Sequence, residues 1–253
     1  MSEPIISVQS LYLTYADGVE ALRNINLDIY PNEVFVLFGP SRAGKSTLLR
    51  LFNRLSDLIE GAQRRGTVQI NGNDIFAPNV NVSSLRRRVS MVFAVPTPLP
   101  GTIYDNLAYG LRMAGIRDPQ ELDRRVERSL KQAALWGEVK ERLYTSAFAL
   151  SGGQKQRLCL ARSLALEPEI ILLDNPTSGL DPISTATVEE SLHELKQRYT
   201  IVMVPHSVQQ AARVADRAGF LMNGDLIESG AATRLFVHPQ HKRTEDYVTG
   251  RFG

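Results

Sequence analysis

The chain has 253 residues, of which 43% are hydrophobic and 22% are charged, and its 29 Lys and Arg against 27 Asp and Glu leave a net charge of +2. This composition is typical of a globular protein, and the near balance of charges argues against a general nucleic-acid binder. The apolar runs have the length of buried strands, well short of the roughly 18 residues that a membrane-spanning helix needs, so a membrane-spanning role is excluded.

The start of the chain and its cysteine content bear on where the protein works. Residues 1–4 do not form a basic region followed by an apolar core, so we expect no secretory signal and an intracellular protein. Cys159 is the single cysteine, which rules out an intrachain disulfide, and we expect it to be a small buried apolar side chain. The arginine clusters at 64–65 and 86–88 are interpreted as solvated faces.

The first thirty residues and the segment 66–75 alternate apolar and polar side chains, as strands with one buried face do. The pair Asn71-Gly72 is a strong signal for a hairpin turn. These patterns predict an antiparallel β layer. Its apolar positions are Val8, Leu11, Leu13, Leu27, Ile29, Val68 and Ile70.

A different pattern begins at residue 34. The run 34–38 is wholly apolar and leads through a glycine-containing loop into apolar residues at helical spacing over 45–55. Toward the C-terminus, the apolar run 170–173 precedes a predicted helix over 183–198 and a further strand over 200–204. Strands that are apolar throughout and alternate with helices indicate a parallel sheet covered on both faces.

Residues 102–143 carry no strand signal, and their apolar residues recur at helical spacing. We predict helices that are broken at 115–119 and near Gly137. This segment is interpreted as a helical subdomain, approximately residues 95–150, inserted within a single domain that spans residues 1–253. The predicted fold class is therefore α/β, with a parallel-sheet core, an antiparallel β layer and a helical subdomain.

The loop after the strand at 34–38 matches G-x-x-x-x-G-K-[ST], the pattern of a phosphate-binding P-loop between a strand and a helix. Backbone N–H groups of such a loop surround a β-phosphate at a helix N-terminus. We expect Lys45 to reach the β- and γ-phosphate oxygens and the Ser46 hydroxyl to join the Mg²⁺ ligands; a plain glycine-rich turn is the alternative. The predicted nucleotide-binding residues here are Gly39, Pro40, Ser41, Arg42, Ala43, Gly44, Lys45, Ser46 and Thr47.

Asp174 stands at the end of the apolar run 170–173. A strand end places a carboxylate beside the phosphate loop of a neighbouring parallel strand, where it can hold Mg²⁺. Taken alone, an ordinary turn aspartate explains this residue equally well. Beside a P-loop, we predict that Asp174 and Ser46 are the metal ligands.

The segment 150–154 closely resembles the signature motif of ATP-binding cassette (ABC) ATPases. It lies at the end of the helical insertion and before the acidic strand, as that family arranges it. A serine hydroxyl, flexible glycines and a helix N-terminus can together place donors on a γ-phosphate. The chain is thereby identified, by resemblance, as an ABC nucleotide-binding cassette whose further predicted nucleotide-binding residues are Ser151, Gly152, Gly153 and Gln154.

The resemblance implies a head-to-tail dimer, in which each ATP lies between the P-loop of one chain and the signature loop of the other. Tyr15 then resembles the aromatic that stacks on adenine, although a tyrosine in the core of the β layer is the alternative. Asp181 resembles part of the D-loop that crosses the dimer interface, and it also suits a helix N-cap before a proline. His206 resembles the switch histidine that contacts the γ-phosphate.

Four passages resemble one subfamily, the ATP-binding subunits of bacterial phosphate importers, and the likeness covers essentially the whole chain. This resemblance implies a peripheral protein on the cytoplasmic face of the inner or plasma membrane, with ATP and Mg²⁺ as cofactors. Its implied partners are a second cassette (in a homodimer or heterodimer), two transmembrane permease subunits and indirectly a phosphate-binding protein, with no nucleic acid. The passages are residues 51–59, 103–111, 133–136 and 242–253.

Four positions depart from the family pattern. Asn175 stands where the family has the glutamate that polarises the attacking water, and an amide cannot take up a proton. Ala94 stands where the family has a glutamine that reaches Mg²⁺ and water. Arg42 replaces a customary glycine, which strains the backbone if the position needs a positive φ. Pro205, before His206, removes an N–H but suits the end of a strand.

Three functions are compared. The leading one is an ATPase subunit that couples ATP binding and hydrolysis to import of inorganic phosphate. The alternative, favoured by Asn175 and Ala94, is a hydrolysis-impaired cassette that serves as a regulatory module or as one half of a heterodimer, although a working ATPase can also tolerate ordinary variation. A cassette acting on DNA or ribosomes is disfavoured, because those usually carry very long insertions or two cassettes. The predicted catalytic residues are Lys45, Asp174, Asn175 and His206.

Overall fold

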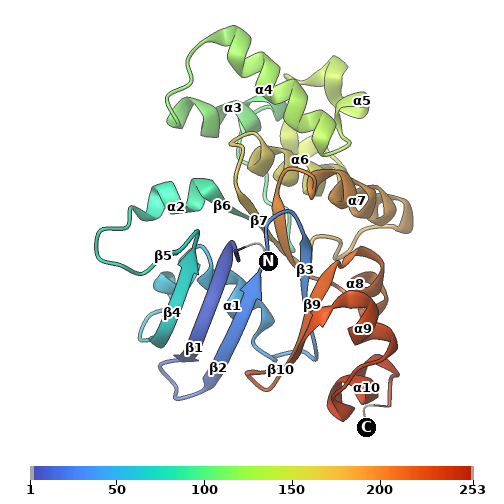
Figure 1. The fold of residues 1–253 in the computed structure, drawn as a ribbon. Helices are drawn as coiled ribbons and strands as arrows, with labels where there is room; N and C mark the ends of the chain where they lie inside the picture. Colours follow the sequence, from blue (N-terminus) through green and yellow to red (C-terminus); the bar gives the residue numbers. More distant parts are fainter. Residues whose placement is uncertain (1–2, 252–253) are drawn as a thin grey trace.

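Two β-sheets form the centre of the molecule, and helices cover the outer face of the larger sheet (Figure 1). The computed structural model describes residues 3–251. Met1 and Ser2 at the start of the chain, and Phe252 and Gly253 of the tail that resembles phosphate-importer subunits, lie outside the described residues.

The smaller sheet is antiparallel, as predicted, with the strand order β2-β1-β4-β5. Asn71 and Gly72, with φ of 50° and 74°, connect β4 to β5. Two successive positive φ values are typical of a type I′ turn, which matches the twist of a hairpin, so the predicted turn is confirmed. The strands are β1 Ile6–Thr14, β2 Glu20–Ile29, β4 Gln63–Ile70 and β5 Asn73–Asp74.

The larger sheet has the order β10-β9-β3-β8-β7-β6 and is parallel from β9 to β6, with β10 added antiparallel at one edge. All residues of β3, β7 and β8 are buried, because this sheet is covered on both faces. The predicted α/β fold with a parallel-sheet core is confirmed. The strands are β3 Val34–Phe38, β6 Val89–Val92, β7 Ile170–Asp174, β8 Thr200–Val204, β9 Arg217–Met222 and β10 Asp225–Ala231.

Strand β3 separates two hydrophobic cores because successive side chains of a strand point to opposite faces. Phe35 and Leu37 pack with the antiparallel sheet and with helix α1. Val36 and Phe38 pack instead with the helices on the far face. The strand that leads into the following loop is therefore closely packed on both of its faces.

Helices account for most of the remaining described chain. At the top of Figure 1, α3, α4 and α5 form the part expected as a helical subdomain, and α8, α9 and α10 pack at the opposite end. Their bounds are α1 Lys45–Leu51, α2 Val82–Arg88, α3 Ile103–Met113, α4 Pro119–Gln132, α5 Trp136–Val139, α6 Gly152–Leu164, α7 Pro182–Leu195, α8 Val208–Val214, α9 Ala232–Val237 and α10 Lys242–Val248; short 3₁₀ turns are η1 Leu55–Leu58, η2 Lys140–Arg142 and η3 Ala147–Ala149.

One predicted helix boundary is wrong. The helix expected over 45–55 ends at Leu51, and Arg54 adopts φ of 59°, which an α-helix cannot accommodate. The break expected near Gly137 lies at residues 133–135, between α4 and α5, where Ala134 has φ of 51°, while Gly137 itself is inside α5. Local periodicity could not reveal either site, because both left-handed residues are non-glycine.

The single cysteine and the arginine clusters have different outcomes. Cys159 is buried as predicted, and burial raises the pKa of its thiol. The interpretation of the clusters as simple solvated faces is partly wrong, since Arg86 donates to the carbonyls of residues 53 and 54 and Arg88 pairs with Glu169 at 2.6 Å. Within residues 3–251, no helix is both long and apolar enough to cross a membrane.

Candidate functional site

A cavity of about 320 Å³ opens where β3 and β8 end and where the loop after β7 begins. Open α/β sheets bind ligands at this edge, outside the carboxyl ends of the parallel strands. The P-loop, the segment after β8 and helix α10 all contribute to its wall. The lining residues are Phe38, Gly39, Ser41, Arg42, Lys45, Ser46, Asn175, Val204, Pro205, His206, Ser207, Val208 and Tyr247.

Two glycines let the loop between β3 and α1 lie against neighbouring backbone. Gly39 has φ of 143°, and a Cβ there would lie 1.9 Å from the carbonyl oxygen of Leu221. Gly44 has φ of 96°, and a Cβ there would lie 2.5 Å from the carbonyl oxygen of Ala21. Both contacts are far too short for a side chain, so the glycines of the P-loop pattern are sterically required.

Arg42 adopts φ of 62°, so the position does need a positive φ, the condition under which strain was expected. A left-handed conformation costs a non-glycine residue roughly 1–2 kcal/mol. The side chain of Arg42 lines the cavity, where it adds a positive charge beside Lys45. The strained backbone conformation therefore occurs at the residue that places this positive charge at the cavity.

The ammonium group of Lys45 lies inside the loop that it follows. Its Nζ donates hydrogen bonds to the carbonyl oxygens of Gly39 at 2.8 Å and Pro40 at 2.6 Å. Burial lowers the pKa of Lys45, and the nearby carboxylate of Asp174 opposes this shift. A cation held against two carbonyls is available to an anion that enters the loop.

The two predicted metal ligands are brought together. Ser46 Oγ donates a hydrogen bond to Asp174 Oδ1 at 2.8 Å, and the side chain of Asp174 is buried. Arg50 Nη2 lies 3.4 Å from the other carboxylate oxygen, Oδ2. Sequence reasoning missed Arg50, although its place one helical turn after Ser46 could have indicated that the two share a face of α1.

Tyr15 contacts the end of the P-loop, and Ala43 lies within it. The hydroxyl groups of Tyr15 and Thr47 lie 2.7 Å apart. Tyr15 also packs on the core beneath the antiparallel sheet, so stacking on adenine and a structural role are both open to its ring. Ala43 is buried, and its carbonyl accepts a hydrogen bond from the N–H of Gly224.

The position expected to carry a catalytic carboxylate holds an amide in an unusual setting. Asn175 has φ of 54°, and its N–H donates to the carbonyl of Val204 at 2.9 Å. Its Oδ1 is buried and has no hydrogen-bond partner among the described residues. Ala94 lies on the loop after β6 and is not one of the described residues that line the cavity.

His206 is exposed and lines the cavity after β8, the strand next to β3, and it follows the buried Pro205. Tyr247 of helix α10 also lines it, and its ring centroid lies 5.1 Å from that of Phe220 and 6.3 Å from that of Phe38. Burial raises the pKa of Tyr247. Sequence reasoning noted this C-terminal segment only as a resemblance, and no local signal placed it at the site.

The remaining predicted residues lie together but outside the cavity lining. Ser151 caps α6, and its side chain forms a capping box with Gln154. Asp181 caps α7 by accepting hydrogen bonds from the N–H groups of Ile183 and Ser184, each at 3.0 Å, which confirms the expected N-cap role. A Cβ on Gly153 would lie 2.6 Å from Ser184 Oγ, so the segments 151–154 and 181–184 are in direct contact.

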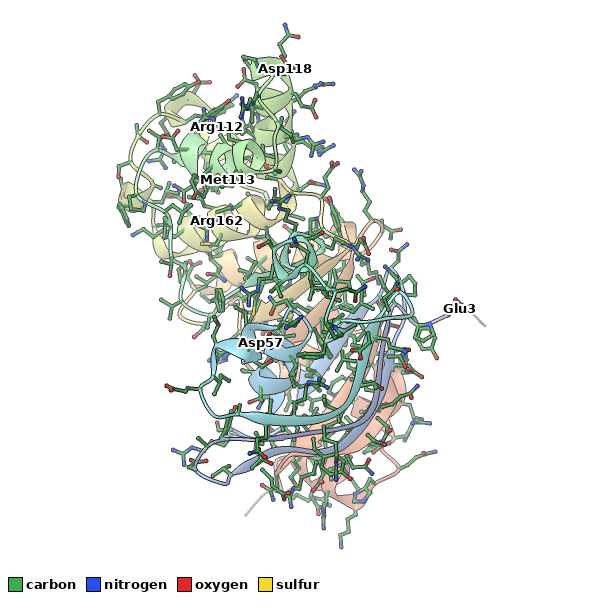
Figure 2. All side chains as sticks on the ribbon, turned by 90° about the vertical axis from the view of Figure 1, so that its left-hand side faces the viewer. Glu3, Asp57, Arg112, Met113, Asp118 and Arg162 are labelled. Atoms are coloured by element: carbon green, nitrogen blue, oxygen red, sulfur yellow. The ribbon has the colours of Figure 1, made fainter. Side chains whose placement is uncertain are left out.

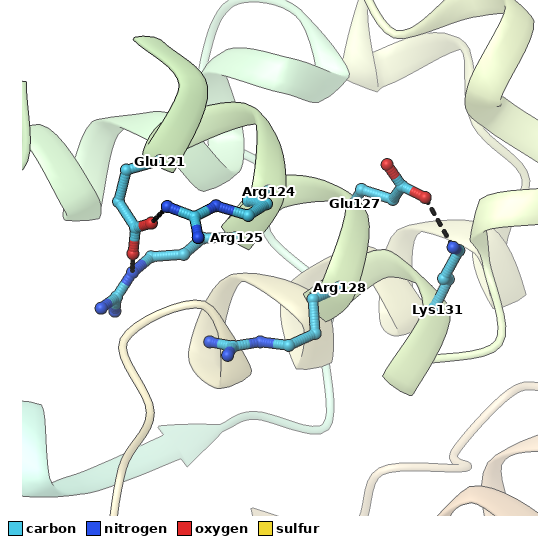
Figure 3. A pocket seen from close by; sticks show the side chains of 6 residues that line it. All are labelled: Glu121, Arg124, Arg125, Glu127, Arg128 and Lys131. Carbon is cyan, nitrogen blue, oxygen red and sulfur yellow. Dashed lines mark hydrogen bonds and ion pairs between the residues drawn. The ribbon is translucent and has the colours of Figure 1, made fainter. Parts of the chain in front are cut away.

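A second cavity, of about 380 Å³, lies along helix α4 (Figure 3). Its wall is made of charged side chains, and Figure 3 shows Glu121 and Glu127 paired with basic neighbours on the same helix. Glu121 pairs with Arg125 at 2.6 Å, Arg128 pairs with Glu167 at 2.6 Å, and Lys131 pairs with Glu127 at 2.5 Å. This surface therefore offers a ligand little unpaired charge, and the cavity at the P-loop is the candidate functional site.

Comparisons with known proteins find a matching family and similar sequences. The family model described as ABC transporter matches residues 22–178. The chain is 50% identical over 253 residues, covering 100% of both chains, to the phosphate import ATP-binding protein PstB 1 of Streptococcus agalactiae serotype III. It is 53% identical over 248 residues, 98% of this chain and 91% of the relative, to PstB 1 of Vibrio parahaemolyticus.

Solved structures show the same fold. The cbiO1 protein of Clostridium perfringens, described as part of the ABC transporter complex cbiONQ, superimposes with a TM-score of 0.82 at 26% identity, over 99% of this chain and 97% of that one. A dimeric ATP-binding cassette in a post-hydrolysis state, bound to ADP and Pi, superimposes with a TM-score of 0.76 at 28% identity. That match covers 90% of this chain and 98% of the other.

Proposed function

Because this chain belongs to the ABC transporter family, we propose that it is the ATP-binding subunit of a phosphate importer, which couples ATP binding and hydrolysis to transport. The observation that carries the proposal is 50% identity to a phosphate import ATP-binding protein over the full length of both chains. The cavity supports it, since Lys45 and Ser46 line one space of about 320 Å³ and Asp174 adjoins it through its hydrogen bond with Ser46.

The donor set at Ser46 and Asp174 fits Mg²⁺. Mg²⁺ prefers oxygen ligands and keeps several waters, so one hydroxyl and one carboxylate are enough protein ligands when phosphate oxygens supply others. The two oxygens lie 2.8 Å apart at the edge of the cavity. When bound, the ion would offset the negative charge of the phosphates. Ser46 and Asp174 would hold it, and Arg50 keeps the carboxylate oriented.

Different residues of the chain then bind different parts of ATP and the attacking water. Lys45 turns from the carbonyls of residues 39 and 40 to phosphate oxygens, while the P-loop N–H groups bind the β-phosphate. His206, which lines the same cavity, holds the γ-phosphate. Asn175 orients water through its amide and takes up no proton.

A second cassette completes the site. The segments 151–154 and 178–181 lie outside the cavity of their own chain, so we assign them to the ATP of a partner chain in a head-to-tail dimer. The dimeric state of one solved relative supports this arrangement. Ser151 and Gly152 are exposed, as residues that contact a partner must be before assembly.

The permease subunits would contact a groove between the parallel sheet and the helices of residues 95–150, which we propose act as a helical subdomain. This groove of about 320 Å³ is lined in part by Phe93 and Tyr109, whose large apolar side chains are exposed. Exposed apolar clusters of this kind mark protein interfaces. In Figure 2, Met113 and Arg162 lie one above the other on this side of the molecule. Binding there would hold the protein on the cytoplasmic face of the membrane.

Asn175 favours one second candidate, a cassette that binds ATP and closes but hydrolyses it slowly as a regulatory module or heterodimer partner. A general base typically contributes about 10²- to 10⁴-fold in rate. Asn175 and Ala94 replace the family's glutamate and glutamine, the two side chains that handle water. These two replacements leave the residues assigned to ATP binding intact. Turnover by the purified chain, alone and with permease subunits, separates the two candidates.

The proposed function is tested by co-expression with the phosphate permease subunits and affinity purification of this chain. We expect two multi-spanning proteins to co-purify, and Tyr109→Glu to abolish their recovery while Mg-ATP still raises the melting temperature. Lys45→Ala should abolish that thermal shift, which is about 2.7 kcal/mol of stabilisation at a hundredfold excess of nucleotide over Kd. Recovery of nucleic acid or of soluble proteins only would overturn the proposal.

A further inference from the structure

Gln210, in the first turn of α8, connects the two loops beside the nucleotide cavity. Its side chain is buried, with the residue 2% exposed. Its Oε1 accepts a hydrogen bond from the backbone N–H of His206 at 2.9 Å. Its Nε2 donates to Thr177 Oγ1 at 2.8 Å and to Glu189 Oε1 at 3.0 Å. One buried amide thus joins the end of β8, the loop after β7 and helix α7.

The chemistry of these partners determines the orientation of the amide. The backbone N–H of His206 can only donate, so it requires the amide oxygen, and the carboxylate of Glu189 can only accept, so it requires the amide N–H. A rotated amide would place oxygen against carboxylate and N–H against N–H. Burial makes such a mismatch costly, and the network therefore has one arrangement.

The amide is also anchored from its outer side. Arg213 donates to both carboxylate oxygens of Glu189, at 2.9 Å and 2.8 Å, and the side chain of Glu189 is only 13% exposed. The N–H of Gln210 donates to Ser207 Oγ at 3.2 Å. Contacts between helices α7 and α8 therefore hold the side-chain amide of Gln210 in place.

Both connected loops carry residues with a place in the proposed function. Thr177 is 6% exposed and lies two residues after Asn175, in the loop that continues to Asp181. His206, whose backbone N–H donates to the amide oxygen of Gln210, lines the cavity. A displacement of either loop therefore reaches the other through two hydrogen bonds, of which the one to Thr177 is buried and the one from His206 is partly buried.

We propose that Gln210 is a positioning residue, which couples His206 to the loop 175–181 so that both loops respond together when nucleotide binds. The inference rests on the proposed function, because the coupled loops belong to the same ATP site. Gln210 acts through the backbone of His206 and the hydroxyl of Thr177. It thereby links the residue assigned to the γ-phosphate with the segment assigned to the dimer interface.

The test uses the full chain with Gln210→Leu, which keeps the volume and removes all three hydrogen bonds, and Thr177→Val, which removes only one acceptor. Gln209→Leu is the matched control, since Gln209 is the exposed neighbour on the same helix. We expect Gln210→Leu to lower the single-turnover rate of Mg-ATP hydrolysis by about 10- to 100-fold, as small misplacements in an active site do. The Kd for Mg-ATP should change less than twofold.

A second measurement does not depend on turnover. Hydrogen exchange with and without Mg-ATP should show protection of both 205–208 and 175–181 in the wild-type chain. In Thr177→Val, which leaves the hydrogen bond between His206 and Gln210 intact, 205–208 should keep its nucleotide-dependent protection and 175–181 should lose it. In Gln210→Leu the nucleotide-dependent protection of both segments should fall, because the acceptor of the His206 N–H is lost as well. The separation in Thr177→Val would not follow from a general loss of stability, which would raise exchange in both segments with and without nucleotide.

Exchange of the two polar groups provides a rescue. Gln210→Glu places a carboxylate against Glu189 and should impair coupling as Gln210→Leu does. Adding Glu189→Gln restores one donor facing one acceptor and should return the rate to within threefold of wild type. Failure of this rescue would overturn the inference but not the proposed function. Equal single-turnover rates in Gln210→Leu and Gln209→Leu would do the same. A wild-type chain that does not bind Mg-ATP would overturn the proposed function as well.

Discussion

The hydroxyl of Ser46 lies 2.8 Å from Oδ1 of Asp174, although 128 positions separate the two residues in the chain. Ser46 lies in the first turn of the helix after β3, and Asp174 ends β7. Strand β8 lies between β3 and β7 in the sheet, so the contact depends on the common direction of three parallel strands. Their carboxyl ends meet at one edge, and this places a hydroxyl and a carboxylate where a metal–phosphate complex fits.

Restoring the two water-handling groups should raise the rate of ATP hydrolysis. Asn175→Glu supplies a carboxylate that can accept a proton, and we expect an increase of at least about tenfold, within the usual range for a general base. Ala94→Gln added to it should increase the rate further. The measurement is phosphate release at saturating Mg-ATP, with Lys45→Ala in the same background as the inactive control.

This prediction has a clear contrary result. If the unaltered chain already turns over at about 1–100 per second, the ordinary range for phosphoryl transfer by kinases, and the double substitution does not raise the rate, the site is not impaired. Another group would then perform the role expected of the glutamate.

Arg42→Gly should affect stability and nucleotide binding in opposite directions. Relief of the left-handed conformation is worth roughly 1–2 kcal/mol, and the greater freedom of glycine in the unfolded chain offsets about 0.5–1 kcal/mol, so we expect a net stabilisation of about 0.5 kcal/mol. Loss of a solvent-accessible positive charge should raise the Kd for Mg-ATP by about two- to fivefold. Urea unfolding and calorimetric titration measure the two effects, and tighter binding by the variant would contradict the assigned role.

Substitution of two glycines by alanine should change the stability of the protein in opposite directions. Gly39→Ala forces a Cβ to within 1.9 Å of the Leu221 carbonyl oxygen and should destabilise the protein by at least about 2 kcal/mol while abolishing ATP binding. Gly137 lies in α5 with nothing within 4 Å of an added Cβ. Gly137→Ala should therefore stabilise the protein by about 0.5–1 kcal/mol. Equal effects in thermal unfolding would show that the loop at Gly39 can shift.

The Glu189–Arg213 pair should contribute a pH-dependent part of the stability. The hydrogen bond from Arg213 lowers the pKa of Glu189 below its ordinary value of 4.5, with burial opposing the shift. A carboxyl whose pKa is lowered on folding stabilises the native state above its unfolded pKa, and this stabilisation is lost as pH falls through the folded pKa. The wild-type chain should exceed Glu189→Gln in urea midpoint at pH 7, and the difference should shrink below pH 4.5. A constant difference across this range would contradict the prediction.

Much of the site could be predicted from local patterns, because some chemistry is local in the chain. The P-loop residues Gly39, Gly44 and Lys45 lie within seven positions, and their pattern follows from steric needs that the structure displays directly. The spans of β3 and β8 were also predictable, since apolar runs of five residues in β3 and of four in β8 favour strands buried on both faces. The Asn71-Gly72 turn belongs to the same class, because its positive φ values depend on two adjacent residues.

Other features depended on contacts that no local pattern encodes. Arg54 and Ala134 end helices in left-handed conformations that their residue types do not favour, so surrounding packing imposes them. Tyr247 lines the cavity only because α10 folds back against the ring of Phe38. Periodicity along the chain cannot report such long-range packing.

The sequence by itself determined the family, the P-loop and the strands and helices of residues 34–55 and 170–204, since each of these depends on residues that are neighbours in the chain. It gave no signal for β6, β9 or β10. The tertiary structure decided which distant side chains meet: Asp174 with Ser46 and Arg50, and Gln210 with Thr177. The physical reason is that hydrogen bonds and ion pairs require their atoms within about 3–4 Å, and only the packing of strands and helices brings residues from separate segments to that distance.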